Sequence, residues 1–464
     1  MTHENEYDIA VLGGGPGGYA AALRAVQRGA KVCCVEQGPL GGTCLNVGCI
    51  PTKAMLHASE LFWDIHHACQ FGFQDAAARL DGPAYMSRVT GMVAQLRKNL
   101  ESLLAARKID IIRGRGNLSD RNTITVDMRA GECRHVRARS VILATGSRPA
   151  RPGMFPWDSP RVFTTDEAAT AQSLPASIMV VGGGVIGCEF ATVCSELGVK
   201  TTVVEMLESL LAPLDVDAGR AVTRSLKARG ADIHTDAKIV SMTADDSRVT
   251  AHIEGGATIT AEAALIAVGR RPNIDDVGLE LAGVEVVDGV VKVDERCRTN
   301  VDGIYAVGDM AERQQYAHLA SRMGIVAADN ATGHDESDDR TVVPIGVYTH
   351  PEIASVGLSE KQLRQRDARY KVAKFPYLAS GMAQAYGKPE GMVKLMADEN
   401  GAILGGLVIG QHATDVIQEV ALAMRHRLTV EHVAGTIHPH PTFVEAVGEA
   451  AEGLLGLPLH MLKA

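Results

Sequence analysis

A glycine-rich hexapeptide occurs twice in the sequence, and this repeat constrains the fold more than any other feature. The first copy, GGGPGG, spans residues 13–18, and the second, GGGVIG, spans residues 182–187. Each copy lies between a short apolar run and a helix-like segment, and an acid, Glu36 or Glu205, follows at the same spacing. This is the strand, turn, helix, strand and acid order of a dinucleotide-binding βαβ unit. The repeat therefore predicts an α/β fold with two Rossmann-like dinucleotide-binding domains.

The glycines within each copy have separate physical roles. Gly13 permits the tight turn, Gly15 leaves room for a pyrophosphate beside the backbone, and Gly18 lets the helix pack closely on the strand. The pyrophosphate would then accept hydrogen bonds from free N–H groups at the start of the helix. A glycine turn can also be purely structural, but the flanking strands and the acid favour binding. The corresponding residues of the second copy are Gly182, Gly184 and Gly187.

The two acids indicate which nucleotides bind. Glu36 and Glu205 each end a predicted strand, where a carboxylate can accept hydrogen bonds from an adenosine ribose. Glu205 would repel a 2′-phosphate, and residues 206–208 contain no arginine to bind one. The second site is therefore predicted to take NAD rather than NADP. A flavin paired with a nicotinamide is the combination that suits hydride transfer between two dinucleotides.

Composition and charge exclude several classes of protein. The chain has 464 residues, of which 46% are apolar and 22% charged, as in a folded globular protein of several domains. Its formal charge of −9 argues against a nucleic-acid partner. No apolar run approaches the roughly 18 residues that a membrane span needs. Nine cysteines do not suit a secreted disulfide framework, so we expect a cytoplasmic protein without a membrane partner.

Two cysteines lie close together after the first acid. Cys44 and Cys49 belong to the segment 41–53, GGTCLNVGCIPTK, and Gly48 with Pro51 would allow an irregular turn that brings the two thiols together. The residues alone leave two interpretations open, namely an exchangeable dithiol and a pair of small buried side chains. Metal ligation is disfavoured because no second cysteine pair has suitable spacing.

Turn-rich segments divide the chain, and one helix connects its parts. Residues 147–153 and 269–273 are rich in turn formers, and residues 333–340 are polar and acidic. We interpret these segments as domain boundaries. Apolar residues at helical spacing predict a long amphipathic helix whose role is packing. They are Val89, Val93, Leu96, Leu100 and Leu103.

The order of the motifs resembles the pyridine nucleotide-disulfide oxidoreductase family across almost the whole chain. The resemblance rests on both glycine motifs, on residues 41–53 and on residues 438–445, HPHPTFVE. It implies FAD in the first site, NAD in the second, and a redox-active disulfide between Cys44 and Cys49. It also implies a C-terminal α+β dimerisation domain. The implied domains are 1–149 (first part of the FAD-binding domain), 150–272 (NAD-binding), 273–342 (central, completing the FAD site) and 343–464 (dimerisation).

The same resemblance implies the cofactor-binding residues and no metal site. Residues 144–147 and 307–309 match later FAD-contacting segments, and His318 beside Ala317 matches a pair that lies against the flavin. Gln315 and Tyr316 depart from the usual family residues there. The implied FAD-binding residues are Gly13, Gly15, Gly18, Glu36, Thr43, Lys53, Gly116, Thr145, Gly146, Ser147, Asp309 and Ala317. The implied NAD-binding residues are Gly182, Gly184, Ile186, Gly187, Glu189, Glu205 and Gly269.

A basic residue is needed because a neutral thiol is a poor nucleophile. By resemblance, His440 supplies this base from the neighbouring subunit of a homodimer, and Glu445 orients the imidazole. His438 is an alternative, since His-Pro-His could also be a metal pair or a structural turn. Lys53 is expected near the flavin, paired with Glu189, and Cys49 is expected to be the thiolate beside the ring.

The implied reaction is the oxidation of protein-bound dihydrolipoamide to lipoamide with reduction of NAD⁺. The implied partners are the lipoyl domains of 2-oxoacid dehydrogenase complexes or of the glycine cleavage H protein. One alternative is another NAD(P)H-dependent disulfide reductase of the same family, although the last cysteine is Cys297 and the chain lacks additional C-terminal cysteines. A non-catalytic flavin or NAD(H) sensor is the other alternative, and it leaves Cys44, Cys49 and His440 without a role.

Overall fold

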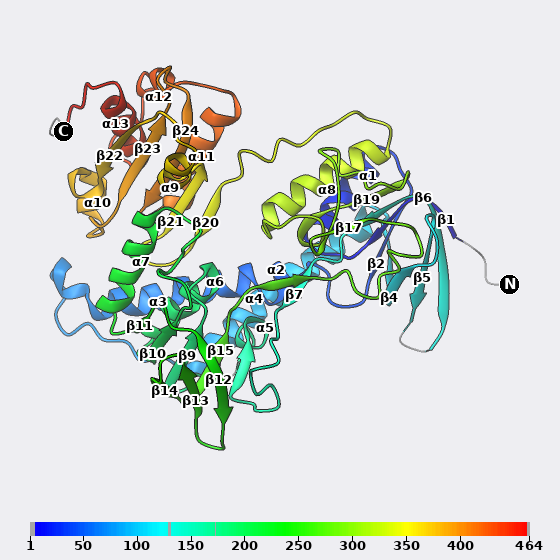
Figure 1. Ribbon diagram of the computed structural model, residues 1–464, viewed down its shortest axis with the longest axis horizontal. Coiled ribbons are helices and arrows are strands. Elements are labelled where there is room, and N and C mark those ends of the chain that lie inside the picture. The colour runs from blue at the N-terminus through cyan, green and yellow to red at the C-terminus, as the bar shows by residue number, and fades with distance from the viewer. Residues whose placement is uncertain (1–4, 129–130, 172, 462–464) are drawn as a thin grey trace.

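Three sheets with their covering helices organise the fold. Each sheet with its helices is called a part of the chain, numbered first, second and third as the sheets are. The computed structural model describes residues 5–128, 131–171 and 173–461. The first sheet lies at the amino-terminal end, the second occupies the middle of the chain, and the third belongs to the carboxyl-terminal part (Figure 1). Among the described residues, no helix is both long and apolar enough to cross a membrane.

The first sheet is a doubly wound sheet around β1. Its strand order is β3-β2-β1-β6-β5-β4, with β19 beside β6. The central strand β1 pairs in parallel with β2 and β6, and Ile9, Ala10 and Val11 are buried because both faces of the sheet are covered. The strands are β1 (Asn5–Leu12), β2 (Val32–Glu36), β3 (Asp110–Arg113), β4 (Arg115–Leu118), β5 (Thr123–Asp127), β6 (Cys133–Leu143) and β19 (Ile304–Ala306).

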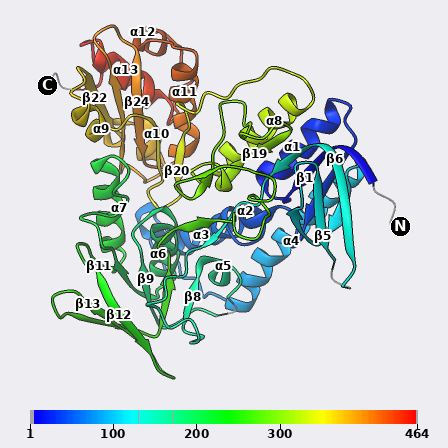
Figure 2. The same cartoon turned by 45° about the vertical axis from the view of Figure 1, so that its right-hand side comes forward.

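Two helices cover this sheet and cross at glycines. The helices α1 (Pro16–Gln27) and α8 (Ala317–Ala331) lie side by side in both views (Figures 1 and 2). A Cβ atom added at Gly324 of α8 would lie 2.2 Å from the carbonyl oxygen of Gly17 in α1. The crossing therefore needs glycine at this position of α8.

The second sheet repeats the βαβ arrangement. Its order is β11-β10-β9-β15-β8, and β9 pairs in parallel with β10 and β15. An antiparallel sheet of β12 (Ile239–Ala244), β13 (Val249–Ile253) and β14 (Thr258–Ala261) adjoins it. The other elements are β8 (Val162–Thr164), α5 (Thr165–Ala168), β9 (Ser177–Val181), α6 (Val185–Glu196), β10 (Lys200–Val204), α7 (Val216–Ala228), β11 (Asp232–His234) and β15 (Ala263–Ile266).

The two turn-rich boundary segments pair with each other. Strand β7 (Ser147–Pro149) forms an antiparallel ribbon with β16 (Arg270–Pro272). The sequence indicated turn-rich domain boundaries at these segments; the paired positions are short strands, because each segment satisfies backbone hydrogen bonds of the other. The chain therefore leaves the first part through β7 and returns to it through β16, which lies beside β7. A short hairpin of β17 (Val286–Val287) and β18 (Val290–Val291) and the turn η2 (Gly308–Met310) follow.

Four helical segments connect β2 to β3. They are α2 (Gly42–Asn46), α3 (Cys49–His66), η1 (Ala68–Phe71) and α4 (Gly82–Ala106). The helix predicted from the apolar spacing is α4, and its Val89 and Val93 are buried as expected. Leu96 and Leu103, however, are exposed by 38% and 42%. Packing was wrongly predicted for these two, because the buried face of α4 runs from Val93 to Leu104, and Leu96 and Leu103 lie off that face.

The third sheet is antiparallel, in the order β20-β21-β24-β23-β22. Its strands are β20 (Ile345–Val347), β21 (Ile353–Gly357), β22 (Lys371–Pro376), β23 (Met392–Ala397) and β24 (Ile403–Ile409). Its helical segments are α9 (Glu360–Gln365), η3 (Tyr377–Ala379), α10 (Gly381–Ala385), α11 (Ala413–Arg425), α12 (Val430–Ala434) and α13 (Glu445–Leu454).

A buried lysine joins the third sheet to the second part. Lys394 of β23 is fully buried, and its Nζ lies 2.9 Å from Asp215, 3.1 Å from Asp217 and 2.6 Å from Glu360. Burial lowers the pKa of Lys394, but the hydrogen bonds to Glu360 and Asp215 outweigh burial and raise it overall. The lysine is therefore charged, and its carboxylates hold α7 against the third sheet.

Replacing Gly324 with alanine is expected to destabilise the protein. The added methyl group would force α8 away from α1, which costs about 1–3 kcal/mol of unfolding free energy. Gly91 provides a matched control, because it is exposed within α4 and an added Cβ would meet nothing within 4 Å. Gly91→Ala should stabilise the helix by up to about 1 kcal/mol. Urea unfolding followed by circular dichroism compares the two, and a Gly324→Ala protein as stable as the parent would contradict the close crossing.

Candidate active site

A large cavity lies between the first and second sheets and opens at both glycine-rich turns. Its volume is about 1620 Å³, which exceeds the roughly 300–1,000 Å³ of a pocket for one small ligand. Residues of all three parts of the chain line it. The predicted cofactor-binding residues that line the cavity are Gly13, Gly15, Glu36, Thr43, Lys53, Gly116, Thr145, Gly146, Ser147, Asp309, Ala317, Gly182, Gly184, Ile186, Glu189, Glu205 and Gly269.

The two glycine turns have nearly the same geometry. Gly13 and Gly182 both have φ of +107°, a conformation that favours glycine. A Cβ atom at Gly18 would lie 1.9 Å from the Gly13 oxygen, and one at Gly187 would lie 1.9 Å from the Gly182 oxygen. Gly18 and Gly187 do not line the cavity, and their place in the structure is the contact between helix and turn.

The middle glycine of each turn faces open space. At Gly15 the nearest atom to an added Cβ is the Gly42 Cα at 3.8 Å, and at Gly184 there is nothing within 4 Å. Both residues precede a helix, α1 or α6, whose first N–H groups have no partner within the helix. The two turns therefore fit phosphate groups, and the cavity between them fits two dinucleotides.

Both acids are held by backbone N–H groups at the edge of the cavity. Glu36 accepts hydrogen bonds from Gly14 and Gly38, each at 2.6 Å. Glu205 accepts from Gly183 at 2.5 Å and from Leu207 at 2.7 Å. A carboxylate has four acceptor positions, so each acid retains acceptor capacity for a ribose.

The two cysteines lie in adjacent helical segments beside this cavity. Cys44 lies in α2, Cys49 is the first residue of α3, and both are partly buried free thiols. The hydrogen bond with the Cys44 side chain lowers the pKa of Cys49 to about 7; burial opposes this change and the charge of Lys53 supports it. The same hydrogen bond, with burial and the charge of Cys49, raises the pKa of Cys44. Within this close pair, the lowered pKa therefore belongs to Cys49 and the raised pKa to Cys44.

Other cysteines of the chain behave differently. Burial raises the pKa of Cys33, Cys194 and Cys297 to about 12. These thiols are held neutral in apolar surroundings, where a thiol is inert. The difference marks Cys49 as the reactive sulfur of the cavity.

A lysine one helical turn after Cys49 forms an ion pair across the cavity wall. Lys53 of α3 donates to both carboxylate oxygens of Glu189 in α6, at 2.8 and 2.9 Å, so the predicted pairing is present. The Glu189 side chain is only 2% exposed. Tyr348, which follows β20, places its ring 4.4 Å from Lys53 Nζ and donates its N–H to Glu189 at 3.0 Å. The three parts of the chain meet at this cation.

An arginine connects the cysteine segment with the residues that are predicted to bind FAD. Arg270 donates to Ser147 Oγ at 2.8 Å and to Thr43 Oγ1 at 3.2 Å, and its side chain is 11% exposed. Ser147 in turn donates to Asp309 at 2.6 Å. This chain of hydrogen bonds fixes one Asp309 oxygen and leaves the other available. Thr145 donates to the Asn273 carbonyl at 2.6 Å, which holds the neighbouring segment.

The predicted base lies away from this cavity in the same chain. His440 Nδ1 is 2.7 Å from Glu445, and the histidine side chain is 80% exposed. Burial raises the pKa of Glu445, but the hydrogen bonds from Thr442 and His440 outweigh it and lower the pKa overall. His438 has a separate carboxylate, Glu419, at 3.0 Å, and its side chain is 11% exposed. Only the second histidine is therefore free to reach another molecule.

The remaining predicted residues are also located. Ala317 and His318 line the cavity, where His318 stacks on Tyr316 and contacts the Pro344 carbonyl at 2.9 Å. Across residues 5–128, 131–171 and 173–461, no group of three or more His, Cys, Asp or Glu side chains is arranged to hold a metal ion.

Sequence reasoning missed three residues of the site, namely Tyr348, Arg270 and Lys238. Tyr348 contacts Lys53 and Glu189 from a distant segment, and no local motif marks it. Arg270 directly follows Gly269, so an arginine after a glycine at the end of a βαβ unit was a usable signal. Lys238 also lines the cavity near Glu205, because Ala237 donates its N–H to the Glu205 carbonyl.

Comparison with known proteins identifies the family. Residues 7–324 match the pyridine nucleotide-disulphide oxidoreductase model, and residues 343–451 match the dimerisation domain of that family. The chain belongs to the pyridine nucleotide-disulphide oxidoreductase family and is an oxidoreductase. This family uses FAD and NAD(H), and the matched dimerisation domain supports a homodimer.

Similar proteins include several dihydrolipoyl dehydrogenases. The enzymes of Bacillus subtilis and Chlamydia muridarum are each 39% identical to this chain, and each match covers 98% of it. The matches cover 99% of the Bacillus subtilis protein and 98% of the Chlamydia muridarum protein. The crystal structure of LpdA from Mycobacterium tuberculosis has a TM-score of 0.91 at 29% identity, covering 96% of this chain and 99% of that one. The HOCl-induced flavoprotein disulfide reductase RclA from Escherichia coli has a TM-score of 0.86 at 26% identity, covering 96% and 99%.

In the reduced protein, alkylation of Cys49 is expected to titrate near pH 7. The thiolate is the nucleophile, so the rate should rise about tenfold per pH unit below the midpoint and level off above it. Iodoacetamide labelling followed by peptide mass spectrometry measures this, with Cys49→Ser as the control for assignment. A midpoint at the ordinary cysteine value of about 8.5 would contradict the assignment of the thiolate.

Proposed function

We propose that this protein oxidises dihydrolipoamide to lipoamide and reduces NAD⁺, using Cys44 and Cys49 as its redox couple. The observation that carries the proposal is the position of the cysteine pair, with its Lys53–Glu189 ion pair, beside the cavity between two dinucleotide-type turns. The similarity to dihydrolipoyl dehydrogenases over nearly the full length supports this substrate class.

We assign FAD to the first turn and NAD to the second. In this assignment residues 1–149 and 273–342 hold FAD, residues 150–272 hold NAD, and residues 343–464 form the dimer interface. Asp309 would bind the ribityl chain through its free oxygen, and Glu36 would bind the adenosine ribose. Support comes from strand β19, which follows the second part but pairs with β6 of the first sheet.

We assign the catalytic base to His440 of the partner subunit. Its exposure of 80% and its pairing with Glu445 at 2.7 Å suit a base that enters a site on another chain. Glu445 would hold the ring in one tautomer and stabilise the imidazolium, as an orienting carboxylate does. Cys44 and Cys49 of one subunit and His440 of the other then form one site.

The reaction begins with the enzyme disulfide oxidised. His440 accepts a proton from one substrate thiol, and the resulting thiolate attacks Cys44 Sγ, which breaks the S–S bond and releases Cys49 as a thiolate. The second substrate thiol then attacks the mixed disulfide, which closes the lipoamide ring and releases Cys44. The proton of this second thiol passes to the departing Cys44 sulfur, and the first proton stays on the His440 imidazolium, which balances the charge of the Cys49 thiolate. The chemistry supplied by bound FAD and NAD is the passage of the electron pair from this dithiol to nicotinamide.

The charges around Cys49 suit its proposed role as the released thiolate. Lys53 lies on the same helix one turn later, and its cation favours the anion. Glu189 keeps that cation in place. We further propose lipoyl domains as partners and the cytoplasm as the location. Nine cysteines in a chain of this length do not suit a secreted disulfide framework, which supports this location.

A substrate panel tests the proposed function. The purified FAD-loaded protein should reduce NAD⁺ with dihydrolipoamide and should show little turnover with NADPH and glutathione disulfide. Glu205 is the physical reason for the preference, because its carboxylate repels a 2′-phosphate. Cys44→Ser should abolish the reaction while leaving FAD bound. Faster turnover with glutathione disulfide would instead assign the protein to another reductase of the family.

Mixed dimers test whether the site crosses subunits. Cys49→Ser and His440→Gln should each lower kcat, the histidine change by about 10²–10⁴-fold. In a hybrid dimer one site combines an intact cysteine pair with an intact histidine, so mixing the two variants should restore activity. Each variant mixed with itself is the control. Hybrids that form without recovering activity would contradict a shared site.

A further inference from the structure

Two polar contacts hold α3 against α6, two helical turns apart. The first is the Lys53–Glu189 ion pair at the cavity. The second lies where Ser59, nearly two turns after Lys53, donates to Glu196, two turns after Glu189. Helix α3 begins with Cys49, so the alignment of these helices sets where Cys49 and Lys53 lie relative to α6.

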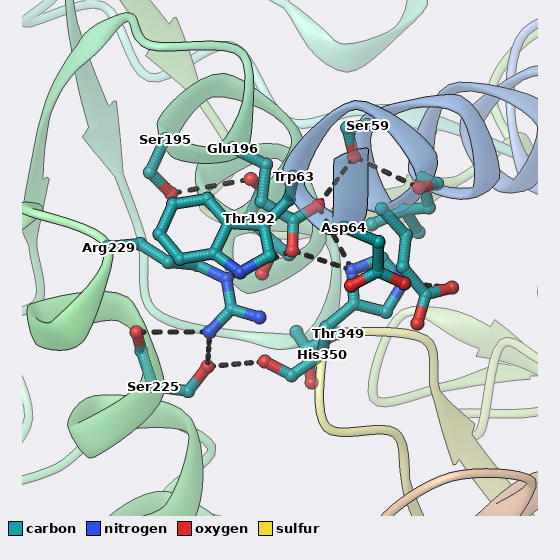
Figure 3. Close-up of polar contacts among 12 residues, drawn as sticks. Ser59, Trp63, Asp64, Thr192, Ser195, Glu196, Ser225, Arg229, Thr349 and His350 are labelled. Carbon is teal, nitrogen blue, oxygen red and sulfur yellow. Dashed lines mark hydrogen bonds and ion pairs between the residues drawn. The ribbon is translucent and has the colours of Figure 1, made fainter. Parts of the chain in front are cut away.

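Glu196 is the centre of the second contact. Its side chain is fully buried, and it accepts hydrogen bonds from Ser59 at 2.7 Å, Arg229 at 2.9 Å and His350 at 2.8 Å. Ser59 lies in α3, Arg229 directly follows α7, and His350 lies between β20 and β21. Figure 3 shows their side chains converging on the carboxylate.

The surrounding groups account for the charge of Glu196. Burial raises its pKa, but the hydrogen bond and charge of His350, with the charge of Arg229, outweigh burial and lower the pKa overall. Arg229 is also held by Ser225 at 2.6 Å and lies over the Trp63 ring at 5.0 Å. An ionised carboxylate is therefore stably buried here.

One segment of the third part touches both contacts. Tyr348 covers Lys53 and donates to Glu189, and His350, two residues later, binds Glu196. His350 Nε2 also lies 3.5 Å from Glu60, whose other oxygen is 3.3 Å from Lys388. The two contacts are therefore linked through α3, through α6 and through this segment.

We propose that Glu196 is a positioning residue for the redox site: its bonds to Ser59, Arg229 and His350 hold α3 in the alignment on α6 in which the Lys53 Nζ, paired with Glu189 of α6, lies where it attracts the Cys49 thiolate. The proposal rests on the proposed role of Cys49. Loss of the Glu196 charge leaves Arg229 without its buried carboxylate, and the buried groups must then rearrange. A shift of α3 carries Cys49 and the Lys53 backbone together, but the Lys53 Nζ stays paired with Glu189 of α6. The shift would therefore draw this Nζ away from the Cys49 sulfur and weaken their attraction.

The direction of the pKa change separates this mechanism from a direct field effect. Removing a negative charge without moving anything would favour the thiolate and lower the pKa of Cys49. Moving Lys53 away would raise it. An upward shift in a Glu196 variant therefore reports on the position of Lys53.

The test measures alkylation of Cys49 against pH in the reduced, FAD-loaded protein. Glu196→Gln should raise the midpoint by at least about half a unit, so that about threefold less thiolate is present below the midpoint. His350→Gln should change the midpoint in the same direction and serves if the first variant does not fold. The assay needs no dihydrolipoamide, so its outcome is distinguishable from a failure of the proposed reaction.

Two comparisons make the result specific. Asp215→Asn removes a carboxylate from the other buried junction, the one at Lys394, without touching α3, and it should leave the midpoint unchanged even if it lowers stability. In a Lys53→Met background, which has lost the cation, Glu196→Gln should have no further effect. An unchanged or lower midpoint in folded Glu196→Gln and His350→Gln proteins would overturn the proposal. An equal shift in Asp215→Asn would also overturn it.

Discussion

The ion pair between Lys53 and Glu189 is the interaction on which the site depends. A carboxylate that is 2% exposed has lost most of its hydration, and a buried charge of this kind is stable only with a well-placed partner. The partner lies on the helix that begins with Cys49, and Tyr348 covers it from the third part. One cation therefore ties together the redox cysteines, the second dinucleotide turn and the carboxyl-terminal sheet.

At the junctions between parts, apolar packing and polar contacts have different effects. One continuous core includes Met55 of α3, Val180 of the second sheet and Ile353 of the third sheet, so these parts share buried surface. Such packing is non-directional. The hydrogen-bonded charges at Glu196, Lys394 and Arg270 add direction, because their donors and acceptors meet in only one alignment. Core packing brings the parts together, and these contacts select their relative placement.

Much of the local structure follows from the sequence because local rules control it. The two glycine turns need only a strand, a positive φ at Gly13 or Gly182, and a helix, and all of these are encoded within a few residues. The amphipathic α4 was also predictable, although burial of Leu96 and Leu103 was not, since burial depends on a neighbouring surface. The ribbon of β7 and β16 escaped prediction because each strand is short and its partner is distant.

By itself the sequence determined the two βαβ units, the five-residue separation of the cysteine pair and the pairing candidates Lys53, Glu189, His440 and Glu445. Short-range sterics and side-chain chemistry suffice for these conclusions. Only the tertiary structure decided that the pKa of Cys49 is lowered while that of Cys44 is raised, that Tyr348 contacts Lys53 and Glu189, and that Glu196 and His350 meet. Those outcomes depend on burial and on charges brought together from distant segments, and no local pattern carries that information.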